Sequence, residues 1–139
     1  MKYTIIALLL LFGNHLFAQG GWIKKHNLDT VGVSGGMADT ANGKLYIGGG
    51  SDGSYFTSRI WEYDPHYNSW KHKSGLPVTS GYSGERMGGF CVGVNNKLYF
   101  GLGLSYYSSY SGCEFYTIEY DPAADTFSRK ADFPGPSRY

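Results

Sequence analysis

The sequence predicts an all-β protein, and the observations that support this prediction are its composition and an internal repeat. Its 139 residues include 21 glycines and 13 tyrosines, whereas leucine, alanine and glutamate are not abundant after residue 18. Such a composition favours short strands joined by tight turns over helices. The phrase "KLYIGGG" at residues 44–50 also returns as "KLYFGLG" at residues 97–103. A phrase repeated at a fixed spacing indicates repeated structural units, so the repeat decides the fold.

The repeat extends over several further positions at two spacings. The paired glycines and the "KLY" tyrosine recur after 53 residues, whereas the "YDP" motif and the aromatic residue that follows it recur after 57. Four residues are therefore inserted between these anchors in the second copy. A tryptophan lies 48 residues before the first of these aromatics, five fewer than the 53 residues that separate the glycine pairs. Five more residues are therefore inserted between Trp70 and Gly88. The matched pairs are Gly35-Gly36 with Gly88-Gly89, Tyr46 with Tyr99, Tyr63-Asp64-Pro65 with Tyr120-Asp121-Pro122, and Trp70 with Phe127; the earlier tryptophan is Trp22.

Each copy is predicted to form four short antiparallel strands. The first strand of a copy ends at Asn-Gly or Asn-Asn, which suit the left-handed dihedrals of a two-residue hairpin turn. The third ends at Asp-Pro, where proline presets the turn and aspartate bonds back to the chain. Four antiparallel strands in about fifty residues describe one blade of a β-propeller. The predicted strands are 90–94 for the first, the "KLY" segments for the second, 59–64 and 116–121 for the third, and segments starting at Trp70 and Phe127 for the fourth.

These residues resemble the kelch repeat over nearly all of positions 22–139. The resemblance implies kelch-type propeller blades in an incomplete ring, and we expect no cofactor. The second copy departs from the pattern at Leu102, which replaces a glycine and which we interpret as a sign of a rerouted exit from the strand. Phe127 replaces tryptophan, and Val33 stands where the second copy has Arg86. The matching positions are Gly35, Gly36, Tyr46, Gly49, Gly50, Tyr63, Asp64, Pro65 and Trp70.

The first eighteen residues are predicted to be a secretory signal peptide. They combine Lys2, an apolar run over 5–12 and Ala18 as the last residue before cleavage. Leu16, at the third position before the proposed cut, is larger than the small residue usually preferred at that position. The run is shorter than the about 20 residues of a membrane span. We therefore expect a secreted or periplasmic chain that has no membrane contact after cleavage, the alternative being an uncleaved N-terminal anchor or a misassigned start.

The remaining chain is expected to divide into parts of a propeller. Residues 19–34 are interpreted as the outer strand of a preceding blade, 35–76 as the first blade, 87–133 as the second and 134–139 as the start of a third repeat. Two blades leave two apolar faces open, and repeat architectures generally need about three units. The missing blades are expected to come from a longer chain, with self-association as the alternative.

Charge excludes one class of partner and the two insertions favour another. Lys and Arg total 12 against 11 for Asp and Glu, which gives no basic patch for nucleic acid. Both insertions fall in connections at the same end of the blade, which in kelch-like proteins commonly lines the ligand-facing surface. Tyrosines among serines and glycines are typical of binding loops, so we expect a protein or glycan ligand there, the alternative being plain connectors. The candidate ligand-binding residues are Tyr82, Arg86, Tyr106, Tyr107 and Tyr110, with a structural role as the alternative for Arg86.

Catalysis is the second functional hypothesis. The resemblance allows a sialic-acid mutarotase-like isomerase, for which Glu85 and Arg86 would be the ionisable groups near the channel, or a copper radical oxidase with a cysteine-tyrosine crosslink, for which no ligand pair can be matched. A purely architectural role is a third hypothesis. The three histidines His26, His66 and His72 lack metal-ligand spacing.

Two further motifs have structural interpretations. Cys91 and Cys113 could form a disulfide if the 103–114 loop folds back toward the innermost strand. The stretch "GGSDGS" at 49–54 is predicted to be a turn, because Asp52 is its single carboxylate and calcium or phosphate sites need more ligands.

Overall fold

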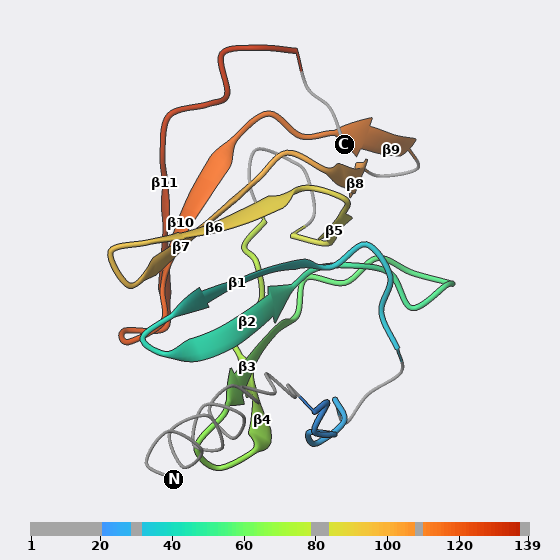
Figure 1. Ribbon diagram of the computed structural model, residues 1–139. Helices are drawn as coiled ribbons and strands as arrows, with labels where there is room; N and C mark the ends of the chain where they lie inside the picture. The colour runs from blue at the N-terminus through green and yellow to red at the C-terminus, as the bar shows by residue number, and fades with distance from the viewer. Residues whose placement is uncertain (1–20, 29–31, 79–83, 108–109, 137–139) are drawn as a thin grey trace, which may run out of the picture.

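The described part of the chain is all-β, as predicted. The computed structural model describes residues 21–28, 32–78, 84–107 and 110–136, and in these ranges the chain forms eleven strands and no helix. The first four strands form one antiparallel sheet in the order β1-β2-β3-β4 (Figure 1). They span Met37–Ala41 (β1), Lys44–Gly48 (β2), Ile60–Asp64 (β3) and Ser69–Lys73 (β4).

The second sheet repeats the first, with extra strands added at one end. Its strand order is β11-β10-β7-β6, so β6, β7, β10 and β11 correspond in turn to β1, β2, β3 and β4 of the first sheet. The fourth strand of each sheet starts one residue before the predicted aromatic. A further hairpin, β8–β9, lies between β7 and β10 and pairs with β5. The strands are Phe90–Val94 (β6), Lys97–Gly101 (β7), Thr117–Asp121 (β10) and Thr126–Arg129 (β11), and in the small sheet Arg86–Met87 (β5), Leu104–Tyr107 (β8) and Tyr110–Cys113 (β9).

The predicted turn chemistry is confirmed at both kinds of turn. Asn42 and Gly43 have φ values of 51° and 72°, and Asn95 and Asn96 have values of 50° and 62°, so both pairs make left-handed two-residue hairpin turns. In the "YDP" turn of the first sheet, the carboxylate of Asp64 accepts the backbone N–H groups of the two residues that follow the proline. Asp121 does the same in the second sheet.

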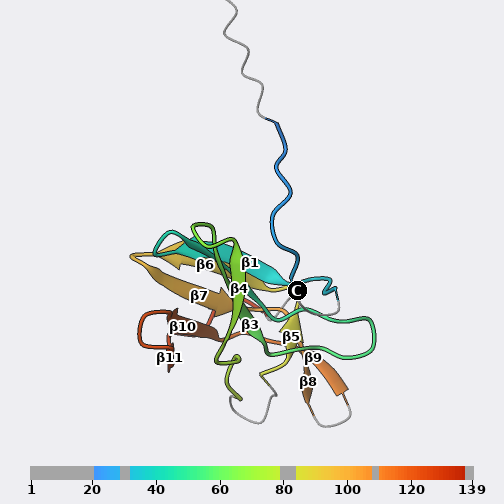
Figure 2. The ribbon, with the colours of Figure 1, turned by 90° about the horizontal axis from the view of Figure 1, so that it is seen from below.

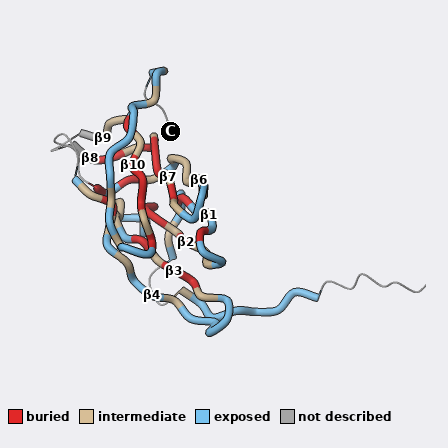
Figure 3. The backbone as a smooth tube through the Cα atoms, turned by 90° about the vertical axis from the view of Figure 1, so that its left-hand side faces the viewer, coloured by how far each residue is buried: buried red, intermediate tan, exposed pale blue. Residues whose placement is uncertain are grey.

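The core lies between the two sheets, which stack face to face (Figures 1 and 3). Alternate residues of each strand point to this interface, because side chains in a strand alternate between its two faces. The ring of Tyr46 meets the ring of Tyr120 edge-on, with centroids 6.3 Å apart. The buried cluster consists of Met37, Ala41, Tyr46, Ile60 and Leu76 from the first blade and its following segment, and Leu98, Phe100 and Tyr120 from the second.

The innermost strands of the two blades approach closely at Gly93. A Cβ atom at this position would lie 2.2 Å from the carbonyl oxygen of Thr40, so only glycine fits. The Gly93 N–H donates to the carboxylate of Asp39 across the interface at 2.9 Å. This bond and that from the Thr40 N–H hold the pKa of Asp39 below its ordinary value.

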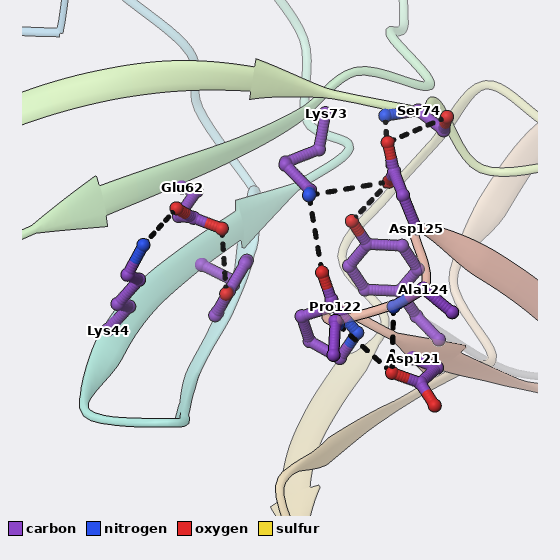
Figure 4. A network of polar contacts seen from close by, with 11 residues as sticks. Lys44, Glu62, Lys73, Ser74, Asp121, Pro122, Ala124 and Asp125 are labelled. Atoms are coloured by element: carbon purple, nitrogen blue, oxygen red, sulfur yellow. Dashed lines mark hydrogen bonds and ion pairs between the residues drawn. The ribbon is translucent and has the colours of Figure 1, made fainter.

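A polar network joins the blades at their outer strands (Figure 4). The carboxylate of Asp125 accepts hydrogen bonds from the backbone N–H and the hydroxyl of Ser74, each at 3.2 Å, and from the hydroxyl of Tyr120. Lys73 donates to the carbonyl oxygen of Pro122 at 3.2 Å. Desolvation raises the pKa of Asp125, but these hydrogen bonds and the Lys73 charge outweigh it, so the pKa lies below its ordinary value.

The segment before the first blade makes the same contact with that blade. The N–H of His26 donates to the side-chain oxygen of Asn68 at 2.9 Å, and the Tyr63 hydroxyl donates to the same oxygen at 2.7 Å. Asn68 precedes Asp125 by 57 residues and His26 precedes Ser74 by 48, so the repeat spacings relate the two contacts. Residues 21–28 form no strand, and their assignment to the outer strand of a preceding blade stays a prediction.

The interpretation of Leu102 as a rerouted exit is wrong. Leu102 has a φ of 57° and the next residue, Gly103, one of 92°, close to the values of 68° and 104° at Gly49 and Gly50 in the first copy. The backbone therefore keeps its path, and leucine adopts a left-handed conformation that is costly for a side chain with a Cβ atom. The first copy requires glycine, since a Cβ at Gly49 would lie 2.5 Å from the carbonyl oxygen of Arg86.

Replacing the strained leucine should stabilise the protein. We expect Leu102→Gly to raise the free energy of unfolding by about 1 kcal/mol, because glycine relieves the left-handed strain. Gly49→Ala is the matched variant and should lower it, since it adds both strain and the contact with Arg86. Urea unfolding followed by circular dichroism would measure both, and a loss of stability in Leu102→Gly would contradict the prediction.

The interblade carboxylate should make stability depend on pH. Because the folded-state pKa of Asp125 lies below the unfolded value of 3.8, its contribution is complete above that value and is lost as the pH falls through the folded pKa. Lys73→Met should cost about 1 kcal/mol near neutral pH by removing the hydrogen bond to Pro122 and the charge beside Asp125. The difference from the parent protein should shrink in unfolding experiments at about pH 3, and a difference that does not vary with pH would argue against this role.

Candidate functional site

The loops that connect the strands gather at two ends of the blades, and one end carries the candidate site. The connection from β2 to β3, the short strand β5 and the β8–β9 hairpin lie together at one end, on the right in Figure 1. The β1–β2 and β6–β7 turns lie at the other end, and Figure 2 shows β5, β8 and β9 side by side. We call the first of these the loop end.

Both copies have the same backbone plan at the loop end, but the second is longer. In the first copy, Ser51 bridges to Ser34 and Phe56. In the second copy, Leu104 pairs with Met87 and Cys113, which are the equivalent positions by the repeat spacing. Four residues, 52–55, close this loop in the first copy, and eight, 105–112, close it in the second. The four inserted residues therefore lengthen one existing hairpin.

The lengthened hairpin carries three of the candidate tyrosines. The backbone of Tyr106 pairs with Ser111, and Tyr107 pairs with Tyr110 at the tip. The side chains of these tyrosines lie outside the described part of the structure, as does the whole of Tyr82. Their role in binding stays a prediction.

A buried polar cluster holds the base of this hairpin. The side chain of Arg86 is fully buried, and its guanidinium donates to the Tyr116 hydroxyl at 2.6 Å and lies 4.7 Å from the centre of that ring. The hydroxyl of Ser105, which pairs with Arg86 in the β5–β8 register, donates to the carboxylate of Glu114. Arg86 therefore has no exposed atom to offer a ligand, and the geometry favours its structural role.

Electrostatics make this cluster sensitive to the loss of either charge. Burial raises the pKa of Glu114, while the hydrogen bond from Ser105 and the positive charge of Arg86 act in the opposite direction. Among the described residues, the Nε and Nη1 atoms of Arg86 and the Oε2 atom of Glu114 have no hydrogen-bond partner. The attraction between these charges and the contact of Arg86 with Tyr116 thus hold the hairpin base in place.

A cavity of about 290 Å³ opens beside the loop of the first blade. The ring of Tyr55 on its wall is 74% exposed. The carboxylate of Asp52 accepts the N–H groups of Ser54 at 2.9 Å and Tyr55 at 2.8 Å, which confirms the predicted turn and holds the pKa of Asp52 below its ordinary value. The residues that line the cavity are Asp52, Tyr55, Phe56, Thr57, Ser58, Arg59 and Glu85.

Sequence reasoning found only part of this cavity. Glu85 was expected near the site, but Tyr55 and Arg59 were not, because the turn around Asp52 gave no sign of a ligand. The repeat could have indicated them, because the loop of the first copy occupies the same position as the hairpin of the second copy. Both loops leave the same end of neighbouring blades, so their residues share one surface.

The possible disulfide is not formed in this structure, because Cys91 and Cys113 are both free. Cys91 lies in β6, pairs with Phe100 and packs against the core, whereas Cys113 ends β9 in the separate small sheet. Burial, with a smaller effect of Asp39, raises the pKa of Cys91 to about 12. This thiol is therefore protonated at neutral pH and unsuited to nucleophilic chemistry.

Two other kinds of site are absent from the described ranges. Across residues 21–28, 32–78, 84–107 and 110–136, no three His, Cys, Asp or Glu side chains come together as metal ligands. Over the same ranges, no helix has the length and hydrophobicity needed to cross a membrane.

Comparison with known proteins agrees with this architecture. Residues 38–77 match the family model described as the Kelch motif. The first blade therefore contains a kelch motif. No curated protein sequence matches it significantly. Among solved structures, this chain is similar to one titled "Structure of YjhT", with a TM-score of 0.71 and 15% sequence identity over 84% of this chain and 42% of that one. At this identity the likeness concerns the fold, and this chain spans less than half of that structure.

Removing the buried guanidinium should destabilise the hairpin base. We expect Arg86→Met to lower the free energy of unfolding by about 2 kcal/mol, because it removes the stronger of the two arginine charges that act on the buried Glu114. The double variant with Glu114→Gln should recover part of this loss, as measured by a double-mutant cycle in urea. Strictly additive effects would show that the two side chains do not interact.

Proposed function

We propose that this kelch protein is a secreted or periplasmic binding module that holds a glycan or protein ligand at the loop end of its blades. The observation that carries the proposal is the lengthened β8–β9 hairpin, which distinguishes the second blade from the first. Beyond the pair that both copies share, its strands add three backbone pairs: Ser105 with Gly112, Tyr106 with Ser111 and Tyr107 with Tyr110. The remainder of the blade keeps the common plan, so the change is confined to a loop, where binding residues are most often found.

The hairpin joins a fixed base to a tip of adaptable composition. Arg86, Ser105 and Glu114 at the base are fully buried, so their positions are restricted. The tip residues are tyrosine and serine, which provide contact area and hydroxyl groups at a low entropic cost. A binding surface on a rigid support loses less conformational entropy when a ligand binds, which favours recognition.

A second candidate function is an enzyme that acts on sugars. It is favoured by the cavity, where the ionisable side chains of Glu85 and Arg59 both contribute to the lining. A propeller isomerase of the sialic-acid mutarotase kind would need such groups, and further ones from blades outside this chain. Nothing in the described ranges favours the copper radical oxidase, since Cys91 is a free, partly buried thiol.

Shortening the hairpin would test the binding proposal. Replacing residues 106–111 with Asn-Gly removes the four inserted residues and closes the hairpin on the paired Ser105 and Gly112. We expect binding on an array of glycans and in pull-down with candidate protein ligands to fall at least about tenfold, with an unchanged melting temperature.

The control is a substitution in a hairpin turn at the opposite end of the blade. Asn96→Gly in the β6–β7 turn should leave binding unaffected, because this turn lies away from the loop end. Unchanged binding after the hairpin is shortened would overturn the proposal. Interconversion of sugar anomers by the parent protein, lost in Glu85→Gln, would support the enzymatic candidate instead.

A further inference from the structure

We infer that the cavity beside Tyr55 binds a neutral monosaccharide unit and discriminates against acidic sugars. The inference rests on the proposed function and names a ligand class and a place for it. It concerns residues of the first blade and the segment leading into the second, which are separate from the lengthened hairpin.

The size and construction of the cavity suit a single sugar ring. Its volume of about 290 Å³ is at the lower limit of small-molecule sites, which span about 300 to 1,000 Å³. The cavity is lined by the loop of the first blade and by Glu85, next to β5. Backbone hydrogen bonds hold these two segments together, from Gly50 N to Arg86 O at 2.7 Å and from Arg86 N to Thr57 O at 3.3 Å. Glu85 is adjacent to this junction in the chain, so the cavity is largely formed before a ligand arrives.

The lining offers an acceptor and a donor that are both free to bind a ligand. Within the described residues, the exposed carboxylate of Glu85 makes no hydrogen bond or ion pair. The Arg59 side chain is exposed and makes no hydrogen bond or ion pair with the described residues. Its backbone is held in place, because its N–H donates to the Thr57 hydroxyl oxygen at 3.1 Å and its carbonyl oxygen accepts from the Gly49 N–H at 3.0 Å. A sugar hydroxyl donates and accepts at the same time, so neighbouring hydroxyls would satisfy both groups.

Tyr55 provides a platform for the less polar face of a sugar ring. Its ring is 74% exposed, although its backbone is held by the hydrogen bond to Asp52. Tyrosine combines apolar contact area with a hydroxyl group, and holding it in place limits the entropy lost on binding. The C–H groups on one face of a pyranose ring would pack on such a surface.

The charge of the lining decides between neutral and acidic sugars. Asp52 and Glu85 contribute two negative charges and Arg59 one positive charge, which leaves a net charge of −1. Arg59 lies close enough to Asp52 to contribute to the lowering of that residue's pKa, after the backbone hydrogen bonds. Part of its positive charge is therefore already compensated, and a sugar carboxylate would be repelled by Glu85.

Titration of the full-length protein with defined sugars would test this inference. The probes are the methyl glycosides of glucose, galactose and mannose, with methyl glucuronide as the acidic comparison, followed by calorimetry and by NMR shifts of residues 52–59. We expect at least one neutral glycoside to bind with a dissociation constant on the order of 1 mM, and the glucuronide at least about tenfold more weakly.

Single substitutions connect the binding to the cavity. Tyr55→Ala and Glu85→Gln should each weaken binding of the neutral glycoside about tenfold or more, and Glu85→Gln should reduce the discrimination against the glucuronide. Tyr67→Ala is the matched control, because Tyr67 is also 74% exposed but lies in the β3–β4 turn, at the opposite end of the same blade. It should leave binding unchanged.

Three outcomes would overturn the inference. Tighter binding of the glucuronide would refute the ligand class. Absence of binding by all neutral glycosides would refute the site. Sugar binding that survives Tyr55→Ala but is lost when the hairpin is shortened would also refute the site, while leaving the proposed function at the hairpin intact.

Discussion

The structure depends on the close backbone approach between the second blade and the glycine pair of the first. Gly50 donates to the carbonyl oxygen of Arg86, and Gly88 donates to that of Gly35, at 2.7 Å and 2.9 Å. Gly49 must be glycine, because its φ is positive and a Cβ atom would collide with the Arg86 carbonyl. These backbone contacts fix the relative position of the blades, the burial of Arg86 and the walls of the cavity.

The same tyrosine–glutamate hydrogen bond recurs in both blades, but the two copies lie in different surroundings. The Tyr46 hydroxyl donates to Glu62 in the interface between the blades, and the Tyr99 hydroxyl donates to Glu119 on the face that points away from the first blade. Hydrogen bonds from Tyr99, Lys130 and Lys97 lower the pKa of Glu119 to about 2. Val92 and Val94, on that same face, are 45% and 46% exposed among the described residues. The expectation that further blades cover this face, from a longer chain or by self-association, stays a prediction.

The differences between the two blades are concentrated in one loop and leave the strands unchanged. The inserted residues lengthen a hairpin whose base contains a buried arginine, Arg86, in place of Val33 of the first copy. The first copy keeps a short turn, and its tyrosine, Tyr55, faces solvent beside charged groups. Two neighbouring blades thus present different chemistry from one backbone plan, which is how repeat proteins diversify a binding surface.

The sequence by itself determined the blades, because glycine pairs, Asn-Gly turns and Asp-Pro turns are local signals that act within a few residues. It also placed the longer loops at one end. Tertiary structure alone decided which equivalent residues are buried, why Leu102 adopts a left-handed conformation, and that Cys91 and Cys113 stay apart. It also brought Glu85 beside Tyr55 and Arg59, since these residues meet only when two blades dock. Contacts between blades join residues far apart in the chain, so local patterns could not reveal them.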